Sequence, residues 1–301
     1  MSFTLRALSL LGLLLALLLQ SQTFSASRTT LPSLYQKPSS LYHPDFYDGG
    51  HDLDLPLGKM RYWEFGPASG KRVVLIHGIS TGASTFDKVG RRLAESNHRV
   101  LVFDLWGRGY SDAPATYYDE ALYVNQVALL LQKVGWKKAS VVGVSLGDDI
   151  PWTGKLARHP LIRHLVALPV VRPLALKAVQ HFYNSVRKDL SDPESIKIAT
   201  IALYQFEHHP GFLRAFMGTV VDFPFSDLHE RYQRVGQLCN TSSLDVLALW
   251  GDADKTVPFD NAKTLKNYVP EATIEVYPGG GHDIIISQHA KMANDIILFL
   301  N

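Results

Sequence analysis

The sequence predicts an α/β fold, a mostly parallel sheet flanked by helices, and three observations support that prediction. Short runs rich in β-branched and apolar residues recur along the chain, and they alternate with segments of helical spacing. Each run is nearly continuously apolar, which is typical of strands that are buried on both faces of a parallel sheet. The 301 residues, of which 46% are hydrophobic and 19% charged, supply enough apolar material for a large core.

The predicted elements follow one another along the chain. Residues 53–57 alternate apolar with polar or turn residues, and residues 60–65 follow after Gly58, so this pair predicts a hairpin. Further strands are expected at residues 73–76, 100–103, 140–144, 165–168, 246–250 and 274–277. Helices are expected at residues 86–96, 121–134 and 288–300. Residues 170–236 break the alternation with helix-like, aromatic-rich sequence, which predicts an inserted lid over the carboxyl edge of the sheet.

The chain is expected to divide into three parts: a signal peptide or membrane anchor (1–27), a linker or surface-packed arm (28–52) and the α/β domain (53–301). Residues 7–19 form a 13-residue stretch with nine leucines and no charge. This stretch is shorter than the ~20 residues that a membrane-spanning helix needs. Small residues follow at Ser21, Thr23 and Ser25, as a cleavage region requires. We therefore expect a secreted protein or one in the secretory pathway, with membrane anchoring through the N-terminus as the alternative.

Charge and cysteine content exclude several classes of protein. Thirty basic and twenty-eight acidic residues give a net charge of +2 without a basic stripe, so a nucleic-acid partner is not expected. The single Cys239 excludes an intramolecular disulfide framework and a cysteine-based metal cluster. Asn240-Thr241-Ser242 is an acceptor pattern for glycosylation if the chain is secreted.

A candidate nucleophile lies at the end of the strand predicted at residues 140–144. The pattern there is Gly143-x-Ser145-x-Gly147. Small residues on both sides of a serine allow a sharp strand-to-helix turn, which pushes the hydroxyl out of the sheet. The position after a β-branched run raises this pattern above chance.

A serine hydroxyl needs a base to remove its proton, and the base needs an acid to orient it. Asp252 and Asp254 follow the strand predicted at residues 246–250. His282 follows the next strand on a loop that begins with three glycines, residues 279–281. The sequence therefore predicts a catalytic triad in the order serine, acid, histidine.

Attack on a carbonyl creates an oxyanion, which backbone N–H groups must stabilise. One predicted donor is the amide of Leu146, the residue after the nucleophile. The other is the amide of Ile79, because His77 and Gly78 begin a loop directly after an early strand.

Four motifs in this order resemble the α/β-hydrolase superfamily, of the lid-containing esterase and lipase type. They are His77-Gly78, Asp104-x-x-Gly107-x-Gly109-x-Ser111, Gly143-x-Ser145-x-Gly147, and Gly251-x-x-Asp254-x-x-Val257-Pro258 with Gly281-His282. The resemblance covers residues 53–301. It implies that Asp254 is the triad acid, with Asp252 as the second choice, and that the Asp104 motif shapes a turn. Epoxide hydrolases and dehalogenases of this superfamily use an aspartate nucleophile, and Ser145 at that position argues against both.

The chain departs from the family pattern directly after the nucleophile. Residues 148–154 read Asp-Asp-Ile-Pro-Trp-Thr-Gly where the family continues with a small residue and an alanine-rich helix. Pro151 lacks an N–H group, and a proline in a helix interior costs ~3 kcal/mol. Asp148 adds a negative charge close to the expected oxyanion.

The sequence predicts a serine hydrolase that cleaves a small hydrophobic or lipid-like carboxylic ester through an acyl-enzyme, without a cofactor. The inserted segment offers aromatic residues that pack against the body or line an acyl pocket: Phe182, Tyr183, Tyr204, Phe206, Phe212, Phe216, Phe223 and Phe225. No metal site is expected at residues 207–209, because neighbouring side chains point in different directions. One alternative is a catalytically impaired ligand-binding homologue. The other is the same triad used for perhydrolysis, lactone opening or C–C bond hydrolysis.

If residues 1–27 are a signal peptide, mass spectrometry of the secreted protein will find an N-terminus between about Ser21 and Arg28. An intact N-terminal segment in a membrane fraction would favour the anchor instead.

Overall fold

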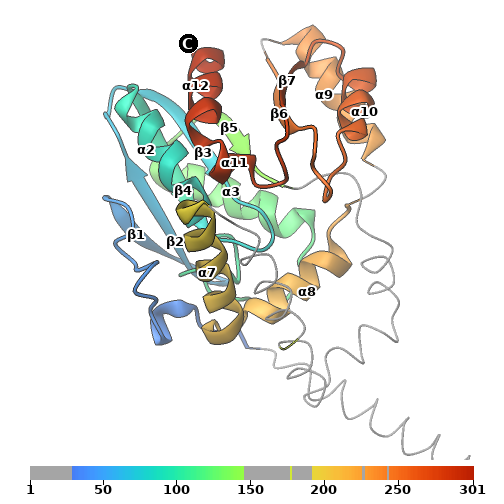
Figure 1. Ribbon diagram of the computed structural model, residues 1–301. Coiled ribbons are helices and arrows are strands. Elements are labelled where there is room, and N and C mark those ends of the chain that lie inside the picture. The colour runs from blue at the N-terminus through green and yellow to red at the C-terminus, as the bar shows by residue number, and fades with distance from the viewer. Residues whose placement is uncertain (1–28, 146–176, 178–191, 226–227, 243) are drawn as a thin grey trace, which may run out of the picture.

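The computed structural model describes residues 29–145, 192–225, 228–242 and 244–301, together with residue 177. Its larger sheet has the strand order β1-β2-β4-β3-β5 (Figure 1). These strands are β1 (Gly50–Leu55), β2 (Gly58–Phe65), β3 (Lys71–Ile76), β4 (His98–Phe103) and β5 (Ser140–Gly143). β2 pairs antiparallel with β1 and β4, whereas β3 pairs in parallel with β4 and β5.

A second sheet contains β6 (Leu247–Gly251) and β7 (Thr273–Tyr277), which are parallel. Each of these seven strands overlaps a strand that the sequence predicts. The strand expected at residues 165–168 lies outside the described residues. The predicted α/β class is confirmed.

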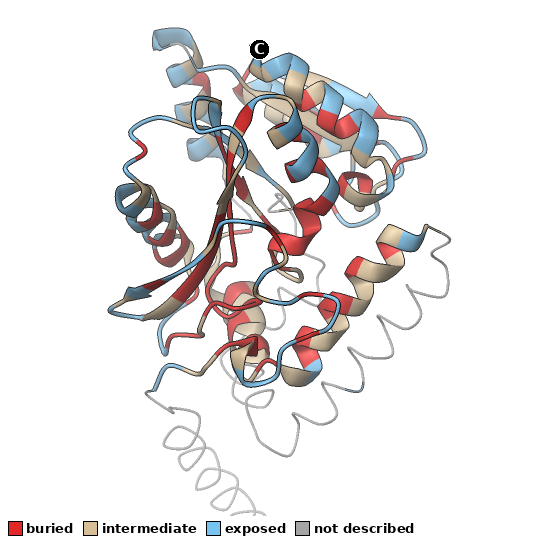
Figure 2. Ribbon diagram, turned by 90° about the vertical axis from the view of Figure 1, so that its left-hand side faces the viewer, coloured by how far each residue is buried: buried red, intermediate tan, exposed pale blue. Residues whose placement is uncertain are grey.

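Alternate residues of β3 and β4 point to opposite faces of the sheet. Helices pack on both faces and cover these side chains. Val73 and Val100 belong to a core cluster with α2 (Asp87–Glu95) and α12 (His289–Leu300). Val74 and Leu101 belong to a second cluster with α3 (Glu120–Val134). Buried residues accordingly lie along the sheet and on the inner sides of the helices (Figure 2). The nearly continuous apolar runs in the sequence reflect this burial on both faces.

Local capping signals fix the ends of the helices. Asp119 precedes α3, and its side chain accepts a hydrogen bond from the Leu122 amide. Gly135 ends the same helix with a φ of 69°, a left-handed conformation that glycine adopts without steric cost. Asp192 caps α7 (Pro193–His208) through the Ser195 amide, and Pro193 occupies the first turn.

Three helices lie between β5 and β6 in the described sequence; the first two fall within the insertion predicted at residues 170–236, and the third extends five residues beyond it. They are α7, α8 (Phe212–Asp222) and α9 (His229–Thr241). Asn240, the predicted glycosylation site, is exposed in the last turn of α9. Two further helices complete the C-terminal part, α10 (Asp260–Tyr268) and α11 (Ile284–Ser287). The single-turn helices η1 (Leu34–Gln36) and η2 (Ala83–Phe86) lie in the N-terminal half.

The segment before β1 is more deeply buried than the sequence predicts. The sequence predicts a linker or a surface-packed arm there, yet Leu34, Tyr42 and Tyr47 all belong to the core cluster on the α2 side. The Tyr42 hydroxyl donates to Asp104 Oδ1 over 2.7 Å. Burial of these tyrosines is favourable because the rings fill the core and the hydroxyl groups find acceptors. No apolar period marks the segment, so the pattern of the sequence does not reveal this burial.

Among the described residues, no helix combines the length and the apolar composition needed to span a membrane.

Acid should destabilise the protein because His209 is buried in its neutral form. His209 Nε2 donates to the Ser111 carbonyl over 3.2 Å, and Nδ1 accepts the Gly211 amide over 3.0 Å. Burial lowers the pKa of His209 from 6.5 to about 4. Between these pH values the unfolded chain binds a proton that the folded protein does not bind. The free energy of unfolding therefore falls as the pH is lowered through this window, by about 2 kcal/mol at pH 5 from this residue.

Urea unfolding at pH 5 and pH 7 will measure the effect. His209→Asn keeps an acceptor for Gly211 but does not titrate, so it should weaken the pH dependence. The control is His43→Asn, because His43 is exposed and its Nδ1 likewise accepts an amide two residues on, that of Asp45. Equal pH dependence of wild-type protein and His209→Asn would refute the assignment.

Candidate active site

The candidate nucleophile lies directly after β5 in a conformation that few non-glycine residues adopt. Ser145 has a φ of 66°, in the left-handed region. The Val144 amide still bonds to the Ile76 carbonyl, so the chain leaves the sheet at Ser145 itself. This is the sharp turn that the Gly143-x-Ser145-x-Gly147 pattern predicts.

Ser145, His282 and Asp254 form a continuous hydrogen-bonded chain. Ser145 Oγ lies 2.5 Å from His282 Nε2, and His282 Nδ1 lies 2.8 Å from Asp254 Oδ2. A carboxylate beside Nδ1 favours the tautomer with the proton on Nδ1, which leaves Nε2 to accept the serine proton. The His282 side chain is 31% exposed and that of Asp254 only 7%. The base is therefore accessible, while the acid is shielded from water.

The loop after β6 holds the acid in place. Asp254 Oδ1 accepts the amides of Thr256 and Val257 over 2.8 and 2.9 Å. Trp250 Nε1 donates to the Val257 carbonyl over 3.0 Å, which ties this loop back to the strand. One carboxylate oxygen thus fixes the loop and the other faces the histidine.

Asp252, the alternative acid, has a different role in the structure. Its Oδ1 accepts the Gly279 amide over 2.7 Å, so it supports the glycine-rich loop that leads to His282. The acid and histidine loops also touch directly, because Ala253 N–H donates to the Gly280 carbonyl over 3.0 Å. A Cβ on Gly251 would lie 2.2 Å from that same carbonyl oxygen. Only glycine at this position allows the two loops to approach so closely.

The loop after β3 lies against the nucleophile. A Cβ on Gly78 would lie 3.1 Å from Ser145 Cβ and 3.5 Å from its Oγ. The amide of Ile79, one predicted oxyanion donor, has no protein acceptor among the described residues. Leu146, the other predicted donor, lies outside the described residues.

The side chain of His77 orients this loop, a role that the His77-Gly78 pattern alone does not reveal. His77 Nε2 accepts the Leu105 amide over 2.9 Å, so Nδ1 carries the proton and donates to the Gly78 carbonyl over 2.7 Å. Burial lowers the pKa of His77 to about 3, so the ring is neutral at ordinary pH. Because carbonyl and N–H point in opposite directions across a trans peptide, this bond turns the Ile79 amide away from the His77 ring.

The Asp104 motif forms a buried turn next to this loop. Asp104 accepts the amides of Ala83 and Tyr110, each over 2.8 Å. Burial raises the pKa of Asp104 to about 6, and these hydrogen bonds oppose the rise. Gly109 has a φ of 49°, and a Cβ there would lie 2.0 Å from Asp104 Oδ2. The motif is therefore structural in this chain, as the resemblance implies.

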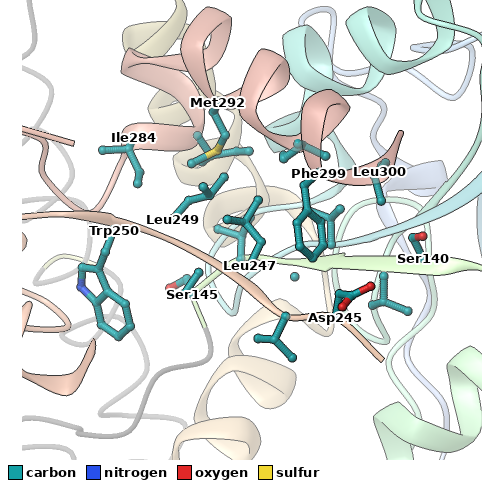
Figure 3. Close-up of a pocket in the computed structure, with 18 of the residues that line it drawn as sticks. Ser140, Ser145, Asp245, Leu247, Leu249, Trp250, Ile284, Met292, Phe299 and Leu300 are labelled. Carbon is teal, nitrogen blue, oxygen red and sulfur yellow. The ribbon is translucent and has the colours of Figure 1, made fainter. Parts of the chain in front are cut away.

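A cavity of about 820 Å³ lies between β5 and β6, with Ser145 and His282 among its lining residues. Apolar side chains from β6 and the C-terminal helices project into it, including Leu247, Leu249, Met292 and Phe299 (Figure 3).

The sequence offers the aromatic residues of the insertion as packing residues or as the lining of an acyl pocket. Most of those that the structure describes pack against one another. Phe206, Phe212 and Phe216 form one group, with ring centroids 4.3 to 6.2 Å apart. Phe223 and Phe225 form a second group, with ring centroids 5.1 Å apart. Phe182 and Tyr183 lie outside the described residues, as do Asp148 and Pro151. Where side chains are described, no group of three or more potential ligands could hold a metal ion.

Known proteins resemble this chain in sequence and in fold. The sequence matches the model of the alpha/beta hydrolase family over residues 73–295. An uncharacterised protein of Mycobacterium tuberculosis is 27% identical over 251 residues, covering 71% of this chain and 70% of its own.

Two solved structures show the same fold. An esterase from Thermogutta terrifontis has a TM-score of 0.64 at 18% identity, covering 83% of this chain and 97% of the esterase. A bromoperoxidase from Bacillus anthracis has a TM-score of 0.58 at 20% identity, covering 83% of this chain and 99% of its own. Since the family model spans well over half of the sequence, the chain belongs to the alpha/beta hydrolase family.

Proposed function

We propose that the protein is a serine hydrolase that cleaves a carboxylic ester through an acyl-enzyme. The observation that carries this proposal is the hydrogen-bonded chain from Ser145 through His282 to Asp254. The left-handed conformation of Ser145 supports it, because strain of this kind persists where the surrounding structure holds a functional group in position.

Each of the three hydrogen-bonded residues has one task in this mechanism. Ser145 Oγ attacks the ester carbonyl while His282 Nε2 takes its proton. Asp254 stabilises the imidazolium that forms and keeps Nδ1 directed at itself. The amides of Ile79 and Leu146 stabilise the oxyanion. His282 then gives its proton to the leaving alcohol, and water releases the acyl group by the same steps.

The substrate that fits this proposal is a small hydrophobic or lipid-like ester. The described residues that lie together with Ser145 and His282 include apolar side chains such as Leu249, which favour an acyl chain over a charged group. The bound ester needs no cofactor in this mechanism, because the protein supplies nucleophile, base and oxyanion donors.

Perhydrolysis, lactone opening and C–C bond hydrolysis use the same three residues, and a bromoperoxidase is among the proteins of similar fold.

A fluorophosphonate probe and a series of p-nitrophenyl esters will test the proposal. Probe labelling with ester turnover supports it. Labelling without ester turnover favours one of the other reactions, and absence of labelling favours a ligand-binding protein.

We also propose that the protein is secreted or lies in the secretory pathway. The leucine-rich residues 7–19 motivate it, and the exposure of Asn240 leaves that side chain accessible to glycosylation.

Removal of the nucleophile or the base should abolish turnover. Ser145→Ala and His282→Ala should each lower kcat on the order of a million-fold, to the background rate, because the triad acts as a unit. Steady-state assays with a short-chain ester will measure this. Substantial activity in purified Ser145→Ala protein would refute the proposed nucleophile.

The two aspartates should differ in their effect on catalysis. Asp254→Asn should lower kcat by about 10⁴-fold, because an amide beside His282 Nδ1 favours the wrong tautomer. Asp252→Asn should have a much smaller effect, because its side chain supports the loop at Gly279 instead of the imidazole. Assays of both variants, each checked for folding by circular dichroism, decide the order. A larger loss in Asp252→Asn would reverse the assignment.

A further inference from the structure

Arg108 is a buried guanidinium whose hydrogen bonds all go to neutral groups. Arg108 is fully buried, with 0% of its surface exposed. Nε donates to the Ile79 carbonyl over 3.1 Å, and Nη1 donates to the Trp106 carbonyl and the Tyr123 hydroxyl over 2.9 and 2.7 Å. Nη2 donates to Thr219 Oγ1 over 2.9 Å. No carboxylate within the described ranges forms an ion pair with it.

A buried cation without an anionic partner is costly, so neutral acceptors alone do not explain its presence. The positive charge reaches the neighbouring loop, because it is one cause of the lowered pKa of His77. It also lowers the pKa of His209 and opposes the rise in the pKa of Tyr118. A fixed positive charge beside an oxyanion loop would favour the developing negative charge there.

The bond to Ile79 fixes the orientation of one peptide group. Arg108 holds the Ile79 carbonyl, while His77 holds the carbonyl of Gly78 one residue earlier. Two successive carbonyls are therefore occupied by buried donors, and neither is left to turn toward Ser145. A carbonyl oxygen facing the nucleophile would repel the oxyanion, so this arrangement keeps the loop in a productive orientation.

The other end of the guanidinium contacts α8. Thr219 Oγ1 accepts from Arg108, lies 2.6 Å from the Tyr123 hydroxyl, and donates to the Ala215 carbonyl over 2.7 Å. α8 also touches the Asp104 turn, since a Cβ on Gly107 would lie 2.2 Å from Ala215 Cβ. The guanidinium thus bridges α8 and the loop beside the nucleophile.

We propose that Arg108 is a positioning residue for the ester hydrolysis: it orients the Ile79–Ser80 peptide of the loop that lies against Ser145 at Gly78, and Thr219 of α8 holds the guanidinium in place. This inference rests on the proposed function. Through Thr219, α8 would influence the reaction, although Thr219 is distant from both Arg108 and Ser145 in the sequence.

The test compares Thr219→Val and Arg108→Lys with the control Thr200→Val. Thr200 lies on α7 and donates to the carbonyl four residues earlier, as Thr219 does, but no arginine binds it in the described structure. Thr219→Val should lower kcat by about 10-fold, with KM nearly unchanged, because the orientation of the loop matters in the transition state. Arg108→Lys should lower kcat by about 100-fold, because one ammonium group does not replace the planar fork.

Amide hydrogen exchange of residues 77–82 supplies a measurement that does not depend on turnover. Exchange should be faster in Thr219→Val and Arg108→Lys, and unchanged in Thr200→Val. Thermal unfolding will show whether each variant is folded, and Tyr123→Phe, which removes only a hydroxyl from the same cluster, replaces any variant that is not.

Unchanged kcat and unchanged exchange in the folded variants would overturn the inference while wild-type turnover keeps the proposed function. A fall in Tm with unchanged kcat would also overturn it, because the role of Arg108 would be structural only. If wild-type protein hydrolyses no ester, the proposed function fails, and the exchange data alone decide whether Arg108 positions the loop.

Discussion

The left-handed backbone at Ser145 is the constraint on which the rest of the site depends. This conformation costs an L-residue roughly 1–2 kcal/mol, so the neighbouring strands must hold it in place. β5 does so by pairing with β3, whose own loop then lies against the serine at Gly78. The base and acid arrive from β7 and β6, and their loops meet only because Gly251 leaves room for the Gly280 carbonyl. Each partner of the nucleophile is thus positioned by a strand of a parallel sheet.

The site also depends on buried polar groups that are satisfied within the protein. Asp104, His77 and Arg108 are all fully buried, and each forms hydrogen bonds to backbone groups of a neighbouring loop. Apolar packing alone is non-directional and would not fix the orientation of a peptide group. Hydrogen bonds to buried side chains do fix it, since an unmade bond there costs about 1–3 kcal/mol. The geometry around the half-buried Ser145 is therefore fixed by groups in the interior.

Much of the fold and of the candidate site follows from the sequence, because both leave local signals. Nearly continuous apolar runs, which alternate with segments of helical spacing, indicate the strands, and the glycines around Ser145 and before His282 indicate the turns that carry these two residues. The choice of Asp254 over Asp252 needed the family spacing, since both follow the same strand. Contacts between distant residues left no local signal: Arg108 meets Thr219 more than a hundred positions away, and Tyr42 reaches Asp104 from a segment without any period. Hydrophobic periodicity indicates which face of an element is buried, but it does not indicate which residue forms a hydrogen bond to a polar side chain on that face.

The burial of the N-terminal segment limits how much of the chain can be trimmed. The Leu31 amide and carbonyl both pair with Ala113, and the Ser33 amide binds Asp112 Oδ1. A protease that cut beyond these residues would remove a strand-like clasp on the Asp104 turn, and a cut after Tyr42 would take a core side chain with it. Cleavage between about Ser21 and Arg28, where the proposed signal peptide would end, leaves these contacts in place, whereas cleavage a few residues further along the chain removes them.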